Sequence, residues 1–409
     1  MMDAKQRKEA LKRGGPSKPW QTECLLGGYY GEEEVEAAVR AIRGSMDPTV
    51  GFGFECEELD QLEQAFATYV GTSHCLAVNG AGTGLDMAMM LLNLEPGDEV
   101  IVPAVNFRAA PNAVYGAGGK VVWCEVDPKT LNADPNDVEK QITPRTRAIF
   151  PVHNFGLSAP MDELLELGRR YPHQKHGPLK VIGDAARACG GGDLDTKIGK
   201  KGWMTVFSFH TQKNMTTLGE GGAITTDDGE IVPRLGGIRQ FGWNTIPGDV
   251  HLKGIGWGSN YKMTKVQAAV GLVQLGRLDD FIARRRKVAQ ARKQMLAGCE
   301  DLTPPYEPPG YFHTYYLYPI QAARGWAGER MARLRSLLRE EYKVECSGGG
   351  QPLHKSRFYD TLNPGQELPV SEEVMSRTFC VPIHPYMPEG DNEYIAASVL
   401  EAVARVKKL

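Results

Sequence analysis

The chain has 409 residues, of which 42% are hydrophobic and 24% charged, and its formal net charge at pH 7 is −3. This composition is typical of a folded globular protein that is large enough for two domains with a substantial core. The near-neutral charge argues against a nucleic acid or an anionic membrane surface as a partner.

Two features bear on the compartment of the protein. The eight cysteines are scattered, without a C-x-x-C pair or a His/Cys cluster at zinc-ligand spacing, so we expect no metal site and mostly buried thiols in a reducing compartment. The basic N-terminus has no apolar segment, and no apolar run approaches the roughly 18 residues needed to span a bilayer. The sequence therefore predicts a cytoplasmic protein without a membrane partner.

The chain begins with a charged segment that is rich in glycine and proline. We interpret residues 1–20 as loose and able to order against a partner, and we assign residues 1–24 to an N-terminal arm. Residues 31–44 and 54–71 carry apolar residues at helical spacing and end in glycine, a common helix cap. Two helices are therefore expected before the first strand.

The next part of the chain alternates between apolar runs of strand length and helical stretches. Near-continuous apolar strands are typical of a parallel sheet that is covered on both faces, so we predict an open α/β core. The strand-like runs are residues 74–80, 99–105, 120–126, 147–152, 180–186, 205–210 and 221–226.

The last part of the chain is predicted to be a second, smaller α/β domain. Residues 264–296 have a long amphipathic helical pattern, and a mixed segment and a final helix follow them. We therefore divide the chain into the arm, a large domain at residues 25–284 and a small domain at residues 285–409.

A glycine-rich turn, AVNGAGTGLDMAMM at residues 77–90, joins the first strand to a helix. Glycine allows close approach of a ligand, and a helix start offers free N–H groups to a phosphate. A dinucleotide fingerprint would need glycine at Leu85, so a nicotinamide cofactor is disfavoured. A tight turn without any ligand is the alternative.

Two further strand ends carry polar groups. Asp184 follows one strand, and an isolated aspartate at a strand end is usually only a helix cap or turn former. Ser208 lies in a later strand and Lys213 in the loop after it, where a lone lysine is ordinarily a solvated surface charge. Pyridoxal phosphate needs this whole set, namely an amine, a carboxylate for its ring nitrogen and a cradle for its phosphate.

Several segments together resemble the DegT/DnrJ/StrS sugar aminotransferase family of pyridoxal phosphate enzymes. The resemblance covers roughly residues 25–405, and its most specific parts are the lysine segment before GEGGA and the NYKM segment before a run of alanines. It implies the type I aminotransferase fold, with a mostly parallel seven-stranded sheet in the large domain. The segments are NGAGTGLDMAM, VPAVNF, FPVHNFG, GDAARACGG, FSFHTQKNMTTLGEGGAITT, GSNYKMTKVQAAVGLVQLGRLDDFIARRR and CVPIHPY.

The resemblance assigns a role to each candidate site residue. Lys213 and Asp184 would be catalytic, as the Schiff-base lysine and the partner of the pyridine nitrogen. The remaining residues would bind the cofactor. Phe107 would stack on its ring, unless it is a core aromatic, and Arg187 lies where the family has a contact with the ring hydroxyl. The phosphate would be held by Gly82, Thr83 and Ser208 of the same chain and by Asn260 of the other subunit in a homodimer.

Some positions depart from the family pattern. Arg187 stands where Gln or His is usual, Lys262 replaces an Arg, and Gly183 replaces an acidic residue. Three histidines at family positions are expected to be structural or substrate-lining rather than catalytic. They are His153, His210 and His384.

The resemblance implies transfer of an amino group from glutamate or glutamine to a ketosugar, nucleotide-linked or free, or to a cyclitol ketone. Lys213 would move the proton between the substrate carbon and the cofactor. Such a reaction serves the biosynthesis of amino sugars, polysaccharides or secondary metabolites. A pyridoxal phosphate enzyme of other chemistry, such as a sugar dehydratase, and a non-catalytic relative are the two alternatives.

Overall fold

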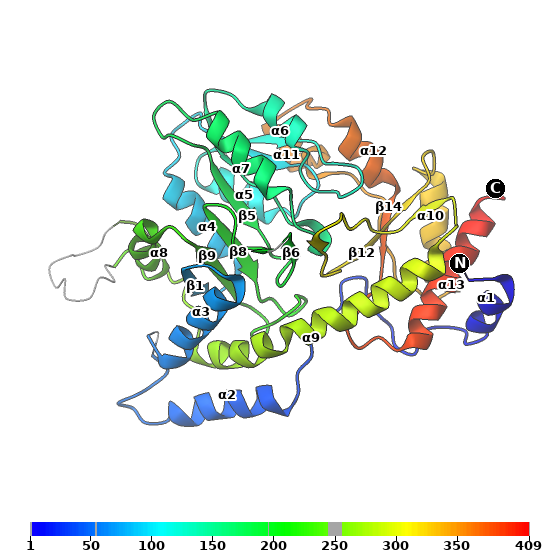
Figure 1. Ribbon diagram of the computed structural model, residues 1–409, viewed down its shortest axis with the longest axis horizontal. Coiled ribbons are helices and arrows are strands. Elements are labelled where there is room, and N and C mark those ends of the chain that lie inside the picture. The colour runs from blue at the N-terminus through cyan, green and yellow to red at the C-terminus, as the bar shows by residue number, and fades with distance from the viewer. Residues whose placement is uncertain (1, 54, 195, 244–255, 409) are drawn as a thin grey trace.

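The structure is a computed structural model, and it describes residues 2–53, 55–194, 196–243 and 256–408. Phe54, the first residue of one predicted helix, lies outside these ranges. Two main sheets with helices around them account for most of the molecule, and the long helix α9 (Lys265–Leu296) runs from one to the other (Figure 1).

The large sheet is mostly parallel, as predicted. Within the described residues its seven strands are His74–Val78 (β1), Glu99–Pro103 (β2), Lys120–Cys124 (β3), Thr146–Ile149 (β4), Lys180–Asp184 (β5), Met204–Ser208 (β8) and Gly222–Thr226 (β9). Their order is β1-β9-β8-β5-β4-β2-β3, and only β9 is antiparallel to its neighbours. The loop at residues 209–221 contains no helix, and a parallel connection would need a crossover of that kind.

Helices cover both faces of the large sheet because its strands are apolar on both sides. Val100 and Val102 of β2 face one helical layer, whereas Ile101 between them faces the other. The first layer is α4 (Ala81–Leu92), α5 (Ala109–Gly116) and α8 (Val232–Arg239). The second layer is α3 (Glu57–Val70), α6 (Pro135–Gln141), α7 (Met161–Arg170) and the beginning of α9.

The small sheet is antiparallel and shares one core with several helices. In the described residues its strands are β10 (Leu302–Thr303), β12 (Tyr318–Ala322), β14 (Thr378–Val381) and β13 (Ser347–Gly348), in that order. These helices include α10 (Glu329–Ser336), α13 (Glu389–Val406) and the end of α9. The predicted domain boundary at 284/285 lies inside α9, and the division into domains stays a prediction.

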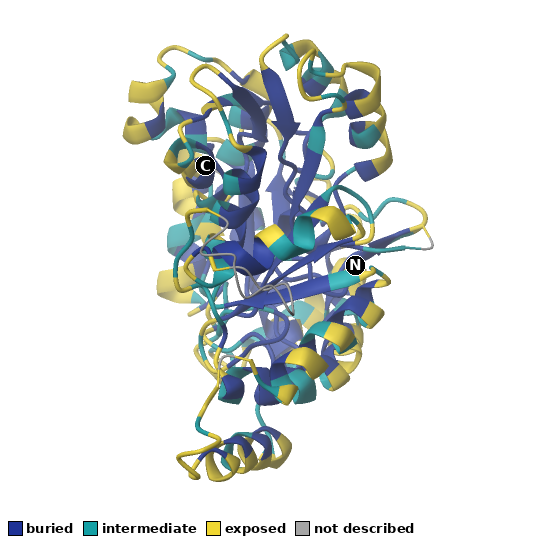
Figure 2. Cartoon of the chain, turned by 90° about the vertical axis from the view of Figure 1, so that its left-hand side faces the viewer, coloured by how far each residue is buried: buried dark blue, intermediate teal, exposed yellow. Residues whose placement is uncertain are grey.

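The remaining elements are short, apart from one helix at the edge of the molecule. They are α11 (Arg357–Leu362), α12 (Pro369–Arg377), a third, three-stranded sheet of β11 (Tyr311–Phe312), β6 (Gly192–Asp193) and β7 (Thr196–Lys197), the 3-10 helices η1 (Asn154–Gly156), η2 (Gly229–Ile231) and η4 (Leu353–Lys355), and the π-helical segment η3 (Leu337–Glu341). Helix α2 (Glu32–Gly44) packs on α9 and is exposed over most of its surface (Figure 2).

The N-terminal arm is not loose, and this expectation was wrong. Residues Ala4–Leu11 form helix α1, which begins with a reciprocal capping box between Asp3 and Gln6 and packs on α13. Three helices rather than two therefore precede β1 in the described residues. The charged composition of residues 1–20 concealed a sequence of good helix formers.

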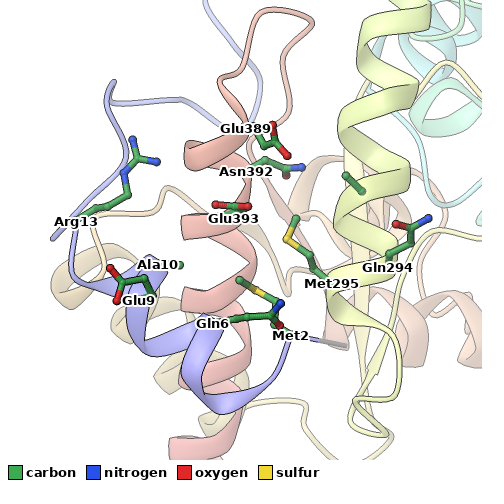
Figure 3. A pocket seen from close by; sticks show the side chains of 11 residues that line it. Met2, Gln6, Glu9, Ala10, Arg13, Gln294, Met295, Glu389, Asn392 and Glu393 are labelled. Carbon is green, nitrogen blue, oxygen red and sulfur yellow. The ribbon is translucent and has the colours of Figure 1, made fainter.

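An open hollow of about 690 Å³ lies between α1, α9 and α13 (Figure 3). The side chains that line it include Gln6 of α1, Arg13 just after α1, Met295 of α9 and Asn392 of α13. None of the predicted site residues belongs to this lining within the described chain.

No helix among the described residues is both long and apolar enough to cross a membrane. The eight cysteines, all of them in described parts of the chain, are free thiols, and six of them are buried.

Candidate functional site

A cavity of about 280 Å³ lies at the carboxyl ends of β5 and β8, beside the start of α4. Ligands of open α/β sheets collect at this edge. Six of the predicted site residues line the cavity, although they come from four separate segments of the sequence: Gly82, Phe107, Asp184, Arg187, Ser208 and Lys213.

Lys213 lies in the loop after β8, and its amine is mostly buried. The Nζ atom lies 2.8 Å from the hydroxyl oxygen of Tyr316 and 3.2 Å from Oε1 of Glu23. Burial lowers the pKa of Lys213 below its ordinary value, and the charge of Arg187 lowers it further, whereas Glu23 and Asp184 oppose this. A lowered pKa favours the neutral amine that nucleophilic and base chemistry requires.

Asp184 is the last residue of β5 and is 3% exposed. One carboxylate oxygen accepts a hydrogen bond from the backbone N–H of Ala186 at 3.0 Å. Burial raises the pKa of Asp184, and this hydrogen bond and the charges of Arg187 and Lys213 reduce the effect. A buried carboxylate with so few partners suits a cationic N–H group of a ligand.

The start of α4 and the end of β8 form a second polar side of the cavity. Gly80, Ala81 and Gly82 line it, and no atom lies within 4 Å of the position that a Cβ of Gly82 would occupy. Free N–H groups of the first helical turn and the positive end of the helix dipole favour an anion here. Ser208 adds its hydroxyl to the cavity.

Phe107 is 56% exposed at the mouth of this cavity, so the alternative that it is a core aromatic is excluded. The guanidinium of Arg187 lies 5.8 Å from the centre of its ring. No hydrogen bond or ion pair reaches that guanidinium from the described residues. Arg187 thus places a half-buried positive charge in the cavity.

Two predicted cofactor ligands do not line the cavity of this chain. The hydroxyl of Thr83 lies 2.7 Å from the carbonyl oxygen of Gly80 and 2.8 Å from Oδ1 of Asn79, within its own turn. Asn260 is exposed, and its carbonyl oxygen accepts a hydrogen bond from Asn79. Their roles in phosphate binding stay predictions.

Sequence reasoning missed Glu23 and Tyr316, the two contacts of the Lys213 amine. Glu23 lines the cavity, and the Tyr316 hydroxyl donates a hydrogen bond to its Oε1. The two residues are 293 positions apart in the chain, and neither belongs to a recognisable motif. No local signal in the sequence could have brought them together.

The three histidines have different surroundings. Buried His153 accepts a hydrogen bond from Ala159 N–H at 3.0 Å, and burial lowers its pKa to about 3. His384 lies 3.0 Å from the carbonyl oxygen of Leu26, and burial lowers its pKa to about 4. His210 lines the cavity. Two are therefore structural, and one is placed where a substrate could pass.

The structure also shows the surroundings of positions 183 and 262, where the sequence departs from the family pattern. A Cβ at Gly183 would lie 2.9 Å from Nε2 of His153 and 3.0 Å from Oγ1 of Thr205, so there is no space for an acidic side chain. The ammonium of Lys262 lies 4.7 Å from the ring centre of Phe241.

The cavity residues fit pyridoxal phosphate. The donor set is a mostly buried amine with a lowered pKa, a buried carboxylate with one hydrogen bond, and a helix start with an adjacent serine hydroxyl. These groups match the aldehyde, the ring nitrogen and the phosphate of the cofactor, respectively.

Comparisons with known proteins agree with this geometry. A model of the DegT/DnrJ/EryC1/StrS aminotransferase family matches residues 32–400. The spore coat polysaccharide biosynthesis protein SpsC of Bacillus subtilis is 32% identical, over 92% of this chain and 95% of its own length. GDP-perosamine synthase of Caulobacter vibrioides is 34% identical, over 83% of this chain and 88% of its own length.

The fold prediction is confirmed by a solved structure. The crystal structure of DesV from S. venezuelae superimposes with a TM-score of 0.80 at 31% identity, and it covers 90% of this chain and 94% of the DesV chain. The residues matched by the family model, 32–400, include every strand of both sheets.

Proposed function

The chain belongs to the DegT/DnrJ/EryC1/StrS aminotransferase family, and on this premise we propose that it moves an amino group from glutamate or glutamine to a ketosugar, nucleotide-linked or free, or to a cyclitol ketone. The enzyme class is a pyridoxal phosphate-dependent aminotransferase, and amino-sugar biosynthesis is the process that its relatives serve. The observation that carries the proposal is the meeting of Lys213 and buried Asp184 in one cavity.

Each side of the cavity has a part in this proposal. Lys213 would bond to the cofactor, and Asp184 would accept a hydrogen bond from its protonated ring nitrogen. The start of α4 at Gly82 and the hydroxyl of Ser208 would hold the phosphate, and Phe107 at the mouth of the cavity would contact the ring. Bound pyridoxal phosphate supplies an electrophilic aldehyde and a ring that accepts electrons.

The chain itself supplies the proton transfer. Nζ of Lys213, once it is free, takes the proton that leaves the substrate carbon, and it must be neutral to do so. Burial and Arg187 favour that neutral state. Asp184 would carry a negative charge beside the protonated ring nitrogen, because a charge-assisted hydrogen bond to bound cofactor would offset the cost of its burial.

The first experiment asks whether the cofactor is bonded to Lys213. We expect the purified protein to be yellow, and we expect borohydride to fix the cofactor to the peptide that contains Lys213, as read by mass spectrometry. Lys213→Ala should lose the fixed cofactor and keep its circular dichroism. Lys200→Ala is the control, because Lys200 is ion-paired with Asp227 at 2.6 Å outside the cavity. Cofactor fixed to another lysine would contradict the assignment.

The second experiment identifies the reaction. Glutamate and glutamine are offered with a panel of nucleotide-linked ketosugars, free ketosugars and inosose ketones, and 2-oxoglutarate and the amino product are measured. An amino product from one acceptor class supports the proposal. Loss of water from the sugar without 2-oxoglutarate would indicate a dehydratase, and a colourless protein would indicate a non-catalytic relative.

We also propose that the active unit is a homodimer with shared sites. Helix α2 and the residues after it carry apolar side chains that are exposed to solvent in the single chain. Their exposure supports a subunit interface at this surface. These side chains are Val35, Ile42, Met46, Val50 and Phe52. Exposed Asn260, outside the cavity of its own chain, would then serve the cofactor of the other subunit.

A further inference from the structure

Three distant segments of the chain meet at the amine of Lys213. Glu23 comes from the segment between α1 and α2, Tyr316 precedes β12, and Lys213 follows β8. Nζ of Lys213 contacts both partners, and the Tyr316 hydroxyl also donates to the same oxygen of Glu23 that the amine approaches. The Tyr316 ring centre lies 4.6 Å from Nζ. The carboxylate therefore has two donors, one of which is the proposed reactive amine.

The segment that carries Glu23 is fixed directly on the lysine loop. The N–H of Gly27 donates to the carbonyl oxygen of Thr211 at 2.9 Å, and the Thr211 hydroxyl donates to the carbonyl oxygen of Leu25 at 3.0 Å. A Cβ at Gly27 would lie 2.2 Å from the carbonyl oxygen of Lys213, so the two backbones touch. The main chain two and four residues after Glu23 is thus fixed on the loop that carries Lys213.

The charges that face Lys213 act in opposite directions. Glu23 and Asp184 are negative and favour the ammonium form, whereas Arg187 is positive and favours the neutral amine. Glu220, which also lines the cavity, lies 3.8 Å from His210. Because Glu23 contacts the amine directly, it is the nearest group that opposes the lowering of the Lys213 pKa by burial and by Arg187.

We propose that Glu23 and Tyr316 are positioning residues for Lys213. The Glu23 carboxylate holds Nζ whenever the amine is protonated and not bonded to the cofactor, and the Tyr316 hydroxyl fixes the carboxylate for that contact. The inference rests on the proposed function, in which Lys213 alternates between a state bonded to the cofactor and a state with a free amine. Glu23 stabilises the ammonium that forms when Nζ takes a proton from the substrate carbon.

The test measures the titration of Lys213 in the full-length protein after removal of any cofactor. An amine reagent is applied briefly at a series of pH values, and mass spectrometry gives the labelling rate of the Lys213 peptide. Lys201, which is ion-paired with Asp162 and Asp193, serves as the internal reference in every sample. The midpoint of the rate profile is decisive, because a change in access alters the rate at all pH values without moving the midpoint.

Glu23→Gln should lower the midpoint for Lys213, because the ammonium loses its negative partner. Labelling at pH 7 should become roughly tenfold faster, since an opposite charge in contact typically changes a pKa by one unit or more. Tyr316→Phe should move the midpoint in the same direction, and the shift in the double variant should be smaller than the sum of the two single shifts, because the three groups form one network. Arg187→Gln should move it in the opposite direction.

Glu220→Gln is the matched control, since this glutamate lines the same cavity without contacting Lys213. If the midpoint in Glu23→Gln equals that in Glu220→Gln, the proposal is overturned. If Glu23→Gln does not fold, an unchanged midpoint in folded Tyr316→Phe overturns it equally. The outcome is independent of borohydride labelling, so failure of this inference and failure of the proposed function can be distinguished.

Discussion

The burial of Asp184 is unfavourable for the fold, and the proposed function gives that buried carboxylate a role. The carboxylate is buried with one hydrogen bond from Ala186, and such a group gains most when a cationic ligand binds beside it. Asp184→Asn keeps the shape and the bond from Ala186 but removes the charge. We expect kcat to fall by roughly 10²–10³-fold, as for the loss of one preorganised electrostatic group. Near wild-type turnover of glutamate would contradict the role of Asp184.

The same substitution should stabilise the protein when the cofactor has been removed. Burial raises the pKa of Asp184, so the folded state holds the proton more tightly than the unfolded state does. The free energy of unfolding therefore falls as pH rises from the ordinary aspartate pKa, about 3.9, through the raised value. Cofactor-free Asp184→Asn should exceed the wild type by about 1–3 kcal/mol at pH 7 in urea unfolding. The gain should diminish as the pH is lowered.

Gly27 is required by the contact between two backbones. A Cβ at this position would lie 2.1 Å from the carbonyl oxygen of Gln212, far inside contact distance. Gly27→Ala should destabilise the protein by roughly 3 kcal/mol or more, since backbone rather than a flexible side chain must move. Gly31→Ala is the control: its Cβ would lie 3.5 Å from the nearest atom, a side-chain nitrogen of Arg277. Equal midpoints of urea unfolding for the two variants would refute this explanation.

At the scale of elements, Asp391 joins the N-terminal segment to α13. Its carboxylate accepts hydrogen bonds from Ser17 N–H at 2.8 Å and from Trp20 Nε1–H at 2.7 Å, and Arg13 lies 3.3 Å away. Asp391→Ala should lower the free energy of unfolding by on the order of 3 kcal/mol, because a buried charged acceptor and its donors are separated. It should also expose residues 1–20 to proteolysis.

This contribution of Asp391 depends on pH. Burial alone would raise its pKa, but the hydrogen bonds from Ser17 and Trp20 and the charge of Arg13 lower it overall. The stabilisation is therefore complete above the ordinary aspartate pKa and is lost as pH falls through the lowered value. The difference between wild type and Asp391→Ala, measured by urea unfolding, should decrease below about pH 4. Glu389→Ala, on the same helix, should change stability by less than about 0.5 kcal/mol.

At the scale of the whole molecule, the shared-site proposal predicts complementation between two inactive chains. A Lys213→Ala chain and an Asn260→Ala chain are mixed under conditions that allow subunit exchange. One site of the mixed dimer then carries both changes and the other carries neither, so each heterodimer should show about half the activity of a normal dimer. Mass spectrometry of the intact dimers verifies the exchange. Exchange without recovered activity would mean that Asn260 acts within its own chain.

The strands of the large sheet were predictable because each one is a short apolar run that can be recognised in the local sequence. Seven apolar runs of strand length were identified in the sequence, and all seven are strands of one sheet. Helix α1 was missed because its charged residues were judged by composition, although Asp3 and Gln6 carry a capping-box signal. The direction of β9 had a signal too, since residues 209–221 have no helical pattern for a crossover.

By itself the sequence determined the candidate lysine, the carboxylate at a strand end and the glycine-rich helix start, because each belongs to a short segment with its own pattern. Only the tertiary structure decided which groups surround Lys213. Glu23 and Tyr316 reach it across 190 and 103 positions of the chain, respectively. Contacts of this kind depend on how the N-terminal segment packs on the lysine loop and on α13, and packing sums many weak interactions that no local pattern records.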